Sequence, residues 1–487
     1  MTARTYRFSP PDRTGWLLGL TGAQLGVLGA AVVVSILLAS ARVPLAAMAA
    51  PLALGAAAAF VRVGSRPLVE ALPPAVQFAA RRAAGRHRWL APLPLPAIGL
   101  TPPLPPCFDG QFVFEVGGVA VVVDRRTGRY AATLRAAGNG FALAERAEQE
   151  RLLGGWGDAL APFCRDRGPV VALRWAEWAV PAGIEEQLAF LAEHGIADDA
   201  DPAAVSYRLL VESAGPLGMR HDTLITLVAG AERLTTAARG QAARDQACAE
   251  ALLAELSMFS ARLETAGLTV GDPLTPGELG RALRTRLDPT TLPGLDRRGR
   301  TLGQLAGLVA PRQAGPLATE ATWSGWRADG SWHRGLWICD WPRTDVAPDW
   351  LAGLLLARVG VRTIAVWCEP VAPRQSRRAI ERAAAKLDAD EEQRARVGLR
   401  IGAGHRRAQT AVAEREAELV SGYPEFTYSG LVTVTAPDVA TLDASTAEAV
   451  QTAAAAGIDL RPLHGRHDQA AAAVLPLARG LAPRLAP

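Results

Sequence analysis

The stretch TGWLLGLTGAQLGVLGAAVVVSILLASA, Thr14–Ala41, lies between Arg13 and Arg42 and contains no charged residue. A second uncharged run, VPLAAMAAPLALGAAAAFV, follows directly as Val43–Val61. About 20 apolar residues in a helix, rising 1.5 Å each, cover the roughly 30 Å hydrocarbon core of a bilayer. The two runs therefore predict a transmembrane hairpin of two spans, followed by a large body outside the lipid.

A cleaved secretory signal is the alternative to retained spans, because Ala39-Ser40-Ala41 resembles a cleavage site. The first run is much longer than the roughly 7–15 residues of a signal core, and a second apolar run follows it, so we favour retention. Arginines precede the first run and follow the second, whereas Arg42 alone lies between them. The positive-inside rule then places both termini in the cytoplasm, with two spans in the plasma (inner) membrane.

Small residues recur at helical spacing in both runs. They predict close packing, either within the hairpin or against another membrane subunit, although a high content of alanine and glycine would also produce them. The positions are Gly15, Gly19, Gly22 and Gly26 in the first run, and Ala46, Ala50, Ala53 and Ala57 in the second.

The segment after the second run is basic and amphipathic, and it completes an N-terminal unit of residues 1–90. It predicts a helix at the lipid headgroups, with arginines on anionic lipid and a tryptophan as interface anchor. A solvated linker helix is the alternative. The residues assigned to this membrane interface are Arg62, Arg66, Arg81, Arg82, Arg86, Arg88 and Trp89.

Residues 91–109 are rich in proline and predict a semi-rigid linker. Strand and helix patterns then alternate, which is typical of an α+β body with sheets covered by long helices. We divide this cytoplasmic body into sub-regions 110–288 and 336–487, which have a similar order of elements, and a connector at 289–335. The predicted fold class is thus a membrane-anchored α+β protein that begins with a two-helix transmembrane hairpin.

Several kinds of chemistry are missing from the sequence. The single lysine, Lys386, follows three alanines and precedes leucine, so a P-loop, which needs Gly-Lys-Ser/Thr, is absent. Five scattered cysteines indicate free thiols, and the pair His464 and His467 lacks further ligands at metal-binding spacing. We predict no catalytic, cofactor or metal site and no enzymatic activity. With a net charge of only +4, direct nucleic-acid binding is not expected.

Tryptophans cluster between residues 323 and 350. Those on the strand near residue 337 fit a sheet core. Trp323, Trp326 and Trp332 lie in the connector and predict a protein–protein interface, where tryptophan is enriched. Core packing is the alternative for all of them, and base stacking on single-stranded nucleic acid is a third interpretation.

The N-terminal unit resembles the small PrgI-type inner-membrane subunit of type IV secretion systems, through its short arm, its paired apolar runs and the segment Gly64–Glu70. The body resembles the N-terminal, non-motor domain of CagE/TrbE-type secretion ATPases. The matching segments are Trp341-Pro342, Glu416–Gly422, Gly430–Thr435 and Leu475–Gly480. In that family an ATPase domain follows the last of these segments, whereas this chain ends at Pro487.

The resemblance implies a non-catalytic scaffold in an actinobacterial-type secretion or conjugation machine. Such a protein would anchor and dock a separate ATPase at the cytoplasmic face of the inner membrane. The implied partners are that ATPase, other inner-membrane channel subunits, anionic lipid, and like or unlike subunits of an oligomer. One alternative is a membrane subunit of a type VII secretion system. Another is a lipid-modifying enzyme at the membrane surface, which would need a polar constellation that the sequence does not show.

Overall fold

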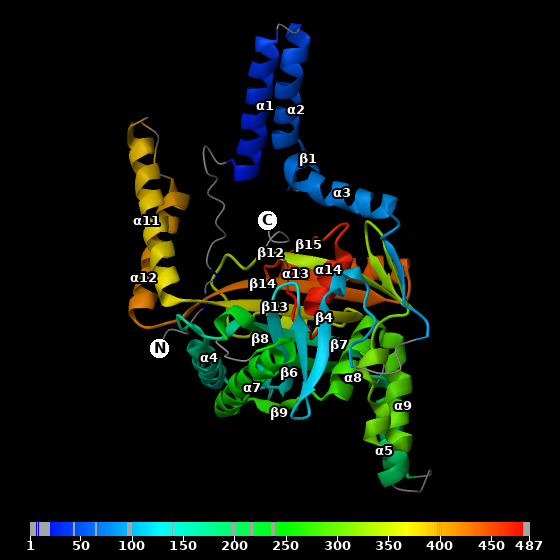
Figure 1. Ribbon diagram of the computed structural model, residues 1–487. Coiled ribbons are helices and arrows are strands. Elements are labelled where there is room, and N and C mark those ends of the chain that lie inside the picture. Colours follow the sequence, from blue (N-terminus) through cyan, green and yellow to red (C-terminus); the bar gives the residue numbers. More distant parts are fainter. Residues whose placement is uncertain are drawn as a thin grey trace.

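The computed structural model of the chain describes residues 6, 8, 20–41, 44–63, 66–94, 100–138, 140–195, 201–214, 218–234, 239–396, 398, 400 and 402–480. Two apolar helices project from one side of a large body, and a third helix crosses beneath them (Figure 1). The elements of this N-terminal unit are α1 (Gly22–Ser40), α2 (Leu45–Phe60), β1 (Arg62–Val63), β2 (Arg66–Pro67) and α3 (Leu68–Ala83).

Only α1 is long and apolar enough to cross a membrane among the described residues. It begins after a capping box formed by Thr21 and Gln24. α2 packs beside α1 but has 16 residues, about 24 Å of helix, because Pro44 precedes its first turn and Val61 is already extended. The predicted two-span transmembrane hairpin is therefore wrong: the second apolar run is longer than the helix it forms. Residues 14–19 of the first run lie outside the described residues.

The body is built on one large antiparallel sheet, with strands in the order β3-β10-β11-β12-β14-β13-β7-β8-β6-β5-β4. Two further strands pair off this path, β15 with β12 and β9 with β6. The bounds are β3 (Arg88–Leu90), β4 (Gln111–Val116), β5 (Val119–Asp124), β6 (Arg129–Ala137), β7 (Val170–Pro181), β8 (Met219–Gly230), β9 (Thr269–Pro273), β10 (Ala318–Ala321), β11 (Trp326–Ala328), β12 (Ser331–Asp340), β13 (Val361–Val371), β14 (Glu425–Ala436) and β15 (Asp459–Pro462).

Helices cover both faces of this sheet, so the body is α+β. The helices of the body are α4 (Arg146–Leu160), α5 (Glu185–His194), α6 (Pro202–Ala214), α7 (Gln241–Thr265), α8 (Pro276–Leu287), α9 (Leu292–Leu302), α10 (Ala352–Leu355), α11 (Pro373–Arg396), α12 (Ala403–Val420), α13 (Val439–Ala455) and α14 (His467–Val474). α11 and α12 pack on each other and project from the body (Figure 1). The range 289–335, expected to be a connector, contains α9, β10 and β11 and contributes strands to the same sheet.

The body consists of two halves with the same order of elements. In each half, two short strands precede a β-α-β-β-α-β unit, and a pair of helices is inserted between its second and third strands. In the first half the unit has the spatial order β7-β8-β6-β9, and in the second half β13-β14-β12-β15. This is the arrangement of a split βαβ fold. Pairing of β7 with β13 joins the two sheets edge to edge.

The core lies on both faces of the sheet because successive strand residues point in opposite directions. In β5, Val121 and Val123 face a cluster with Leu252 and Phe259 of α7, whereas Val122 faces a cluster with Leu283 of α8. α13 covers the second half on the α7 side, and α14 packs on the other face. Continuous apolar strands of this kind are expected where helices cover both faces of a sheet.

Candidate functional site

α3 is seated on the body through Phe78 and Arg81. The Phe78 ring is buried and packs edge-on against Trp323, with ring centroids 5.7 Å apart. Arg81 donates to the Asp468 carboxylate at 2.6 Å. Gly465 allows this close approach, because it has a φ of +70° and a Cβ there would lie 2.9 Å from the Trp323 ring and 3.1 Å from the Phe78 Cβ. The helix that follows the apolar pair is therefore held by both packing and charge.

The chain after α3 joins the sheet directly. β3 pairs antiparallel with β10, and Trp89 lies opposite Thr319 in this register. Arg88 donates to Glu320 at 2.8 Å across the same pair of strands. The segment that follows α3 is thus an edge strand of the second half of the body.

The chain before α1 is also held by the body. Tyr6 and Val346 exchange two backbone hydrogen bonds, of 3.0 and 2.9 Å. Phe8 stacks on Trp341, with ring centroids 5.3 Å apart, and meets the edge of Trp350 at 5.0 Å. We call the contacts of Tyr6 and Phe8, together with those of Phe78 and Arg81, the anchor junction. The body thus contacts the chain both before α1 and after α2.

Burial keeps two titratable groups of the region around α14, His467 and Cys107, uncharged at pH 7. His467 is buried and accepts a hydrogen bond from the Gly335 N–H at 3.2 Å. Burial, with repulsion from His464 and Arg334, lowers the pKa of His467 to about 3, so it is neutral at pH 7. Burial and the Asp468 carboxylate raise the pKa of the Cys107 thiol, so this cysteine is protonated and unreactive.

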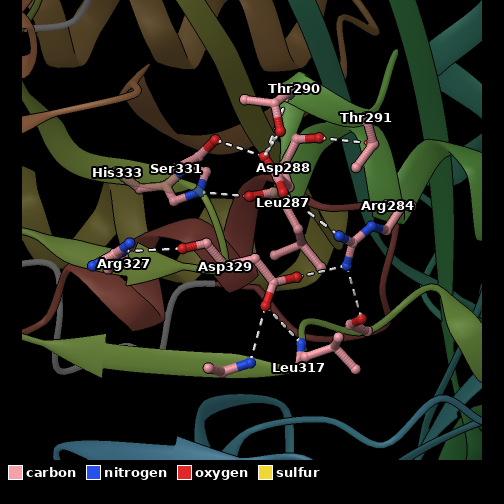
Figure 2. A network of polar contacts seen from close by, with 12 residues as sticks. Arg284, Leu287, Asp288, Thr290, Thr291, Leu317, Arg327, Asp329, Ser331 and His333 are labelled. Carbon is pink, nitrogen blue, oxygen red and sulfur yellow. Dashed lines mark hydrogen bonds and ion pairs between the residues drawn. The ribbon is translucent and has the colours of Figure 1, made fainter. Parts of the chain in front are cut away.

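A second polar cluster joins the end of α8 to the β11–β12 turn (Figure 2). Arg284 donates to Asp329 at 2.6 Å, and Asp329 also accepts from the Leu317 N–H at 2.8 Å. Asp288 accepts from the hydroxyls of Thr290 and Ser331, at 2.6 and 2.9 Å. Neighbouring donors already bond both carboxylates. The cluster therefore holds the end of α8 to the β11–β12 turn, and its geometry differs from that of an acid–base pair facing a substrate.

His333 lies at the centre of the Figure 2 cluster, in β12. One ring nitrogen lies 2.8 Å from the Leu287 carbonyl and the other 2.9 Å from the Thr435 hydroxyl. Burial lowers its pKa to about 4, more than hydrogen bonding and the Asp288 charge raise it. The neutral imidazole therefore serves as a structural bridge between α8 and β14.

The geometry offers no metal centre within the described ranges, since no three His, Cys, Asp or Glu side chains converge there. The pair His464 and His467, considered from the sequence, lies with ring centroids 6.0 Å apart and edge to face. His464 stacks parallel to Trp323, at 5.5 Å. These histidines belong to the packing around the anchor junction.

The residues assigned to the membrane interface divide into two groups. Arg81 donates to a carboxylate of the body and Trp89 is half-buried in the sheet, whereas Arg88 pairs with Glu320 but remains exposed. Arg62, Arg82 and Arg86 are exposed. The Arg66 side chain lies outside the described part of the structure, although its backbone forms β2.

Most of the small residues assigned to helix packing do not lie in the contact between α1 and α2. A Cβ added at Gly22 or Gly26 would meet nothing within 4 Å. The contact between α1 and α2 is made instead at Gly55, where a Cβ would lie 2.5 Å from the Ala31 Cβ, and at Ala59, whose carbonyl accepts from Gln24 at 2.7 Å. Ala46, Ala50 and Ala53 are exposed and Ala57 is half-buried, whereas Gly15 and Gly19 lie outside the described residues.

The three tryptophans assigned to a protein interface have different environments. Trp326 is only 2% exposed and packs on Phe108 in the core, so its assignment to a surface is wrong. Trp332 is half-buried beneath the Arg327 guanidinium, 5.9 Å away. Trp323 is 42% exposed and receives Phe78 of α3, so it forms an interface within the chain.

Sequence reasoning missed the partners that complete the anchor junction. Tyr6 and Val346, and Arg81 and Asp468, are hundreds of residues apart in the sequence, and no local pattern links them. One signal was available: Phe78 is the only aromatic residue in α3, on the side opposite Leu72 and Val76.

No protein-family model matches the chain, and no curated protein matches it either.

Proposed function

We propose that this protein is a non-catalytic membrane scaffold that docks a separate ATPase at the cytoplasmic face of the plasma membrane, within a machine of the type IV secretion kind. One observation carries the scaffold part of the proposal: an apolar helix, α1, projects from a body that grips the chain on both sides of the α1–α2 pair. The resemblance of the segments near residues 64–70 and 416–435 supports the secretion part.

The chemistry of the body supports a binding role. The buried polar groups of the Figure 2 cluster are bonded to one another, and the P-loop motif is absent from the sequence. A scaffold without its own motor needs surfaces for partners, and exposed apolar residues mark such surfaces.

α6 provides an apolar surface of this kind. None of the side chains described in residues 202–213 is buried, although they include Val205, Tyr207, Leu209 and Leu210, all exposed. α5, on which α6 packs, lies on the side of the body remote from α1 (Figure 1). A surface there faces away from the membrane, where a cytoplasmic ATPase would have access.

The test is recovery of the full-length tagged chain from native membranes in mild detergent. We expect a P-loop ATPase to co-purify with the wild type and to be lost from Leu209→Asp/Leu210→Asp. The matched control is Leu302→Asp/Leu305→Asp, which places the same charges at exposed leucines of another surface and should retain the ATPase. Purification without any nucleotide-hydrolysing partner would contradict the docking proposal, and equal loss in both variants would contradict the role of α6.

A further inference from the structure

α3 has two faces of different chemistry. Phe78 and Arg81 contact the body, whereas Leu72 and Val76 are 51% and 59% exposed. Since successive helical residues are rotated by about 100°, Val76 lies about 200° from Phe78, on the opposite side of the helix. The exposed alanines 79 and 83 continue the Leu72 and Val76 face toward the C-terminal end of α3. One face of α3 is thus used by the protein, and an apolar face is left uncovered.

The uncovered face looks toward the side from which α1 projects. In Figure 1, α3 lies crosswise between the α1–α2 pair and the body, and Phe78 points to the body through its contact with Trp323. The base of α1 is tied to the first turn of α3, because the Thr21 hydroxyl lies 3.5 Å from the Glu70 carboxylate. A bilayer that contains α1 would therefore meet the Leu72 and Val76 face of α3.

We propose that α3 is an interfacial helix whose Leu72 and Val76 side chains enter the lipid surface around α1. The partner is the bilayer itself, and continuity with α1 is the reason for choosing lipid over a protein. The inference rests on the proposed membrane anchoring by α1. An interfacial helix presents its apolar face to the boundary between headgroups and acyl chains and keeps its polar residues at the edges. Arg82 and Arg86 are also exposed, and an anionic lipid surface attracts basic side chains near it.

This arrangement differs from the contact expected from the sequence, in which arginines on anionic lipid and Trp89 as an interface anchor held the helix at the membrane. Arg81, whose side chain is 27% exposed, donates to Asp468 and so is directed at the body, whereas Arg88 pairs with Glu320 but remains 69% exposed. In this arrangement Leu72 and Val76 contact lipid, whereas Arg81 contacts the body. α3 then lies between the bilayer and the sheet, and it sets the distance of the body from the membrane.

The experiment measures the depth of three positions in the full-length chain reconstituted into phosphatidylcholine–phosphatidylglycerol vesicles. An environment-sensitive fluorescent amino acid replaces Val33, Val76 or Val420, one at a time; all three side chains are exposed in the structure. Val33 lies in α1 and reports anchoring, whereas Val420 ends α12 in the body and is the control. The quenchers are brominated phosphatidylcholine in the bilayer and iodide in the water.

We expect brominated lipid to lower emission by about half at positions 33 and 76 and to leave position 420 unchanged, since interfacial helices lie about 5–10 Å deep. Iodide should quench position 420 alone. Quenching by brominated lipid at 33, with iodide quenching at 76 equal to that at 420, overturns the interfacial role of α3 while leaving the anchor intact. Absence of lipid quenching at 33 overturns the membrane anchor and the inference with it.

Discussion

The protonation of His333 should set part of the acid sensitivity of the body. Its pKa falls from 6.5 to about 4 in the folded protein, because the ring is buried between Leu287 and Thr435. The unfolded chain binds the proton first, so stability is fully present above pH 6.5 and is lost as the pH falls toward 4. Linkage gives a loss of about 2 kcal/mol at pH 5 and about 3 kcal/mol below pH 4 from this residue.

The assay is denaturant unfolding of the full chain in mild detergent, followed by tryptophan emission, at pH 7.5 and pH 5. His333→Gln keeps a donor and an acceptor but removes the titration, so its free energy of unfolding should change less between the two pH values, by about 2 kcal/mol. His194→Gln, at an exposed position on α5, is the matched control and should follow the wild type. Equal pH dependence of His333→Gln and wild type would refute the reasoning.

Three further predictions concern the N-terminal unit. In a double-mutant cycle, Arg81→Ala and Asp468→Asn should couple by about 1.5–3 kcal/mol in unfolding free energy, as expected for a shielded, charge-assisted hydrogen bond; additive effects would show that the pair is not formed. Gly55→Leu should lower the thermal midpoint in detergent because its side chain would overlap Ala31, at a cost of about 1–3 kcal/mol, whereas Gly22→Leu, in open space, should not; similar midpoints would contradict the helix contact. Phe8→Ala should speed tryptic cleavage in the N-terminal arm, since each lost aromatic contact is worth about 0.5–1.5 kcal/mol; an unchanged cleavage rate would place the arm off the body.

The sequence predicted an apolar helix near the N-terminus correctly, but it did not predict the number of helices long enough to cross a membrane. An uncharged run of this length predicts a membrane-crossing helix near the N-terminus, and α1 is such a helix by length and composition. The number of spans was overestimated because hydropathy counts residues in a run, whereas a helix ends where the backbone conformation changes. Pro44 and Val61 lie outside α2, which shortens the helix below the span length.

The face that each apolar helix buries could not be predicted from residue spacing alone. Gly22 and Gly26 repeat at four residues, as do Ala46 and Ala50, but so do Ala31 and Ser35, which are buried. In an alanine-rich helix every face carries small residues, so composition gives no preference among them. The partner helix decides which face is buried, through contacts such as Gly55 with Ala31.

By itself, the sequence determined the apolar anchor, the α+β character of the body and the absence of a P-loop, because these follow from runs, periodicities and motifs within short segments. The pairing of β7 with β13 into one sheet, the seat of Phe8 among Trp341 and Trp350, and the Arg81–Asp468 contact were decided only by the tertiary structure. The physical reason is that burial and pairing depend on what a side chain meets across the fold. Arg81 and Arg88, assigned to lipid from the sequence, pair with carboxylates of the body, and Leu72 and Val76 of α3 are left exposed.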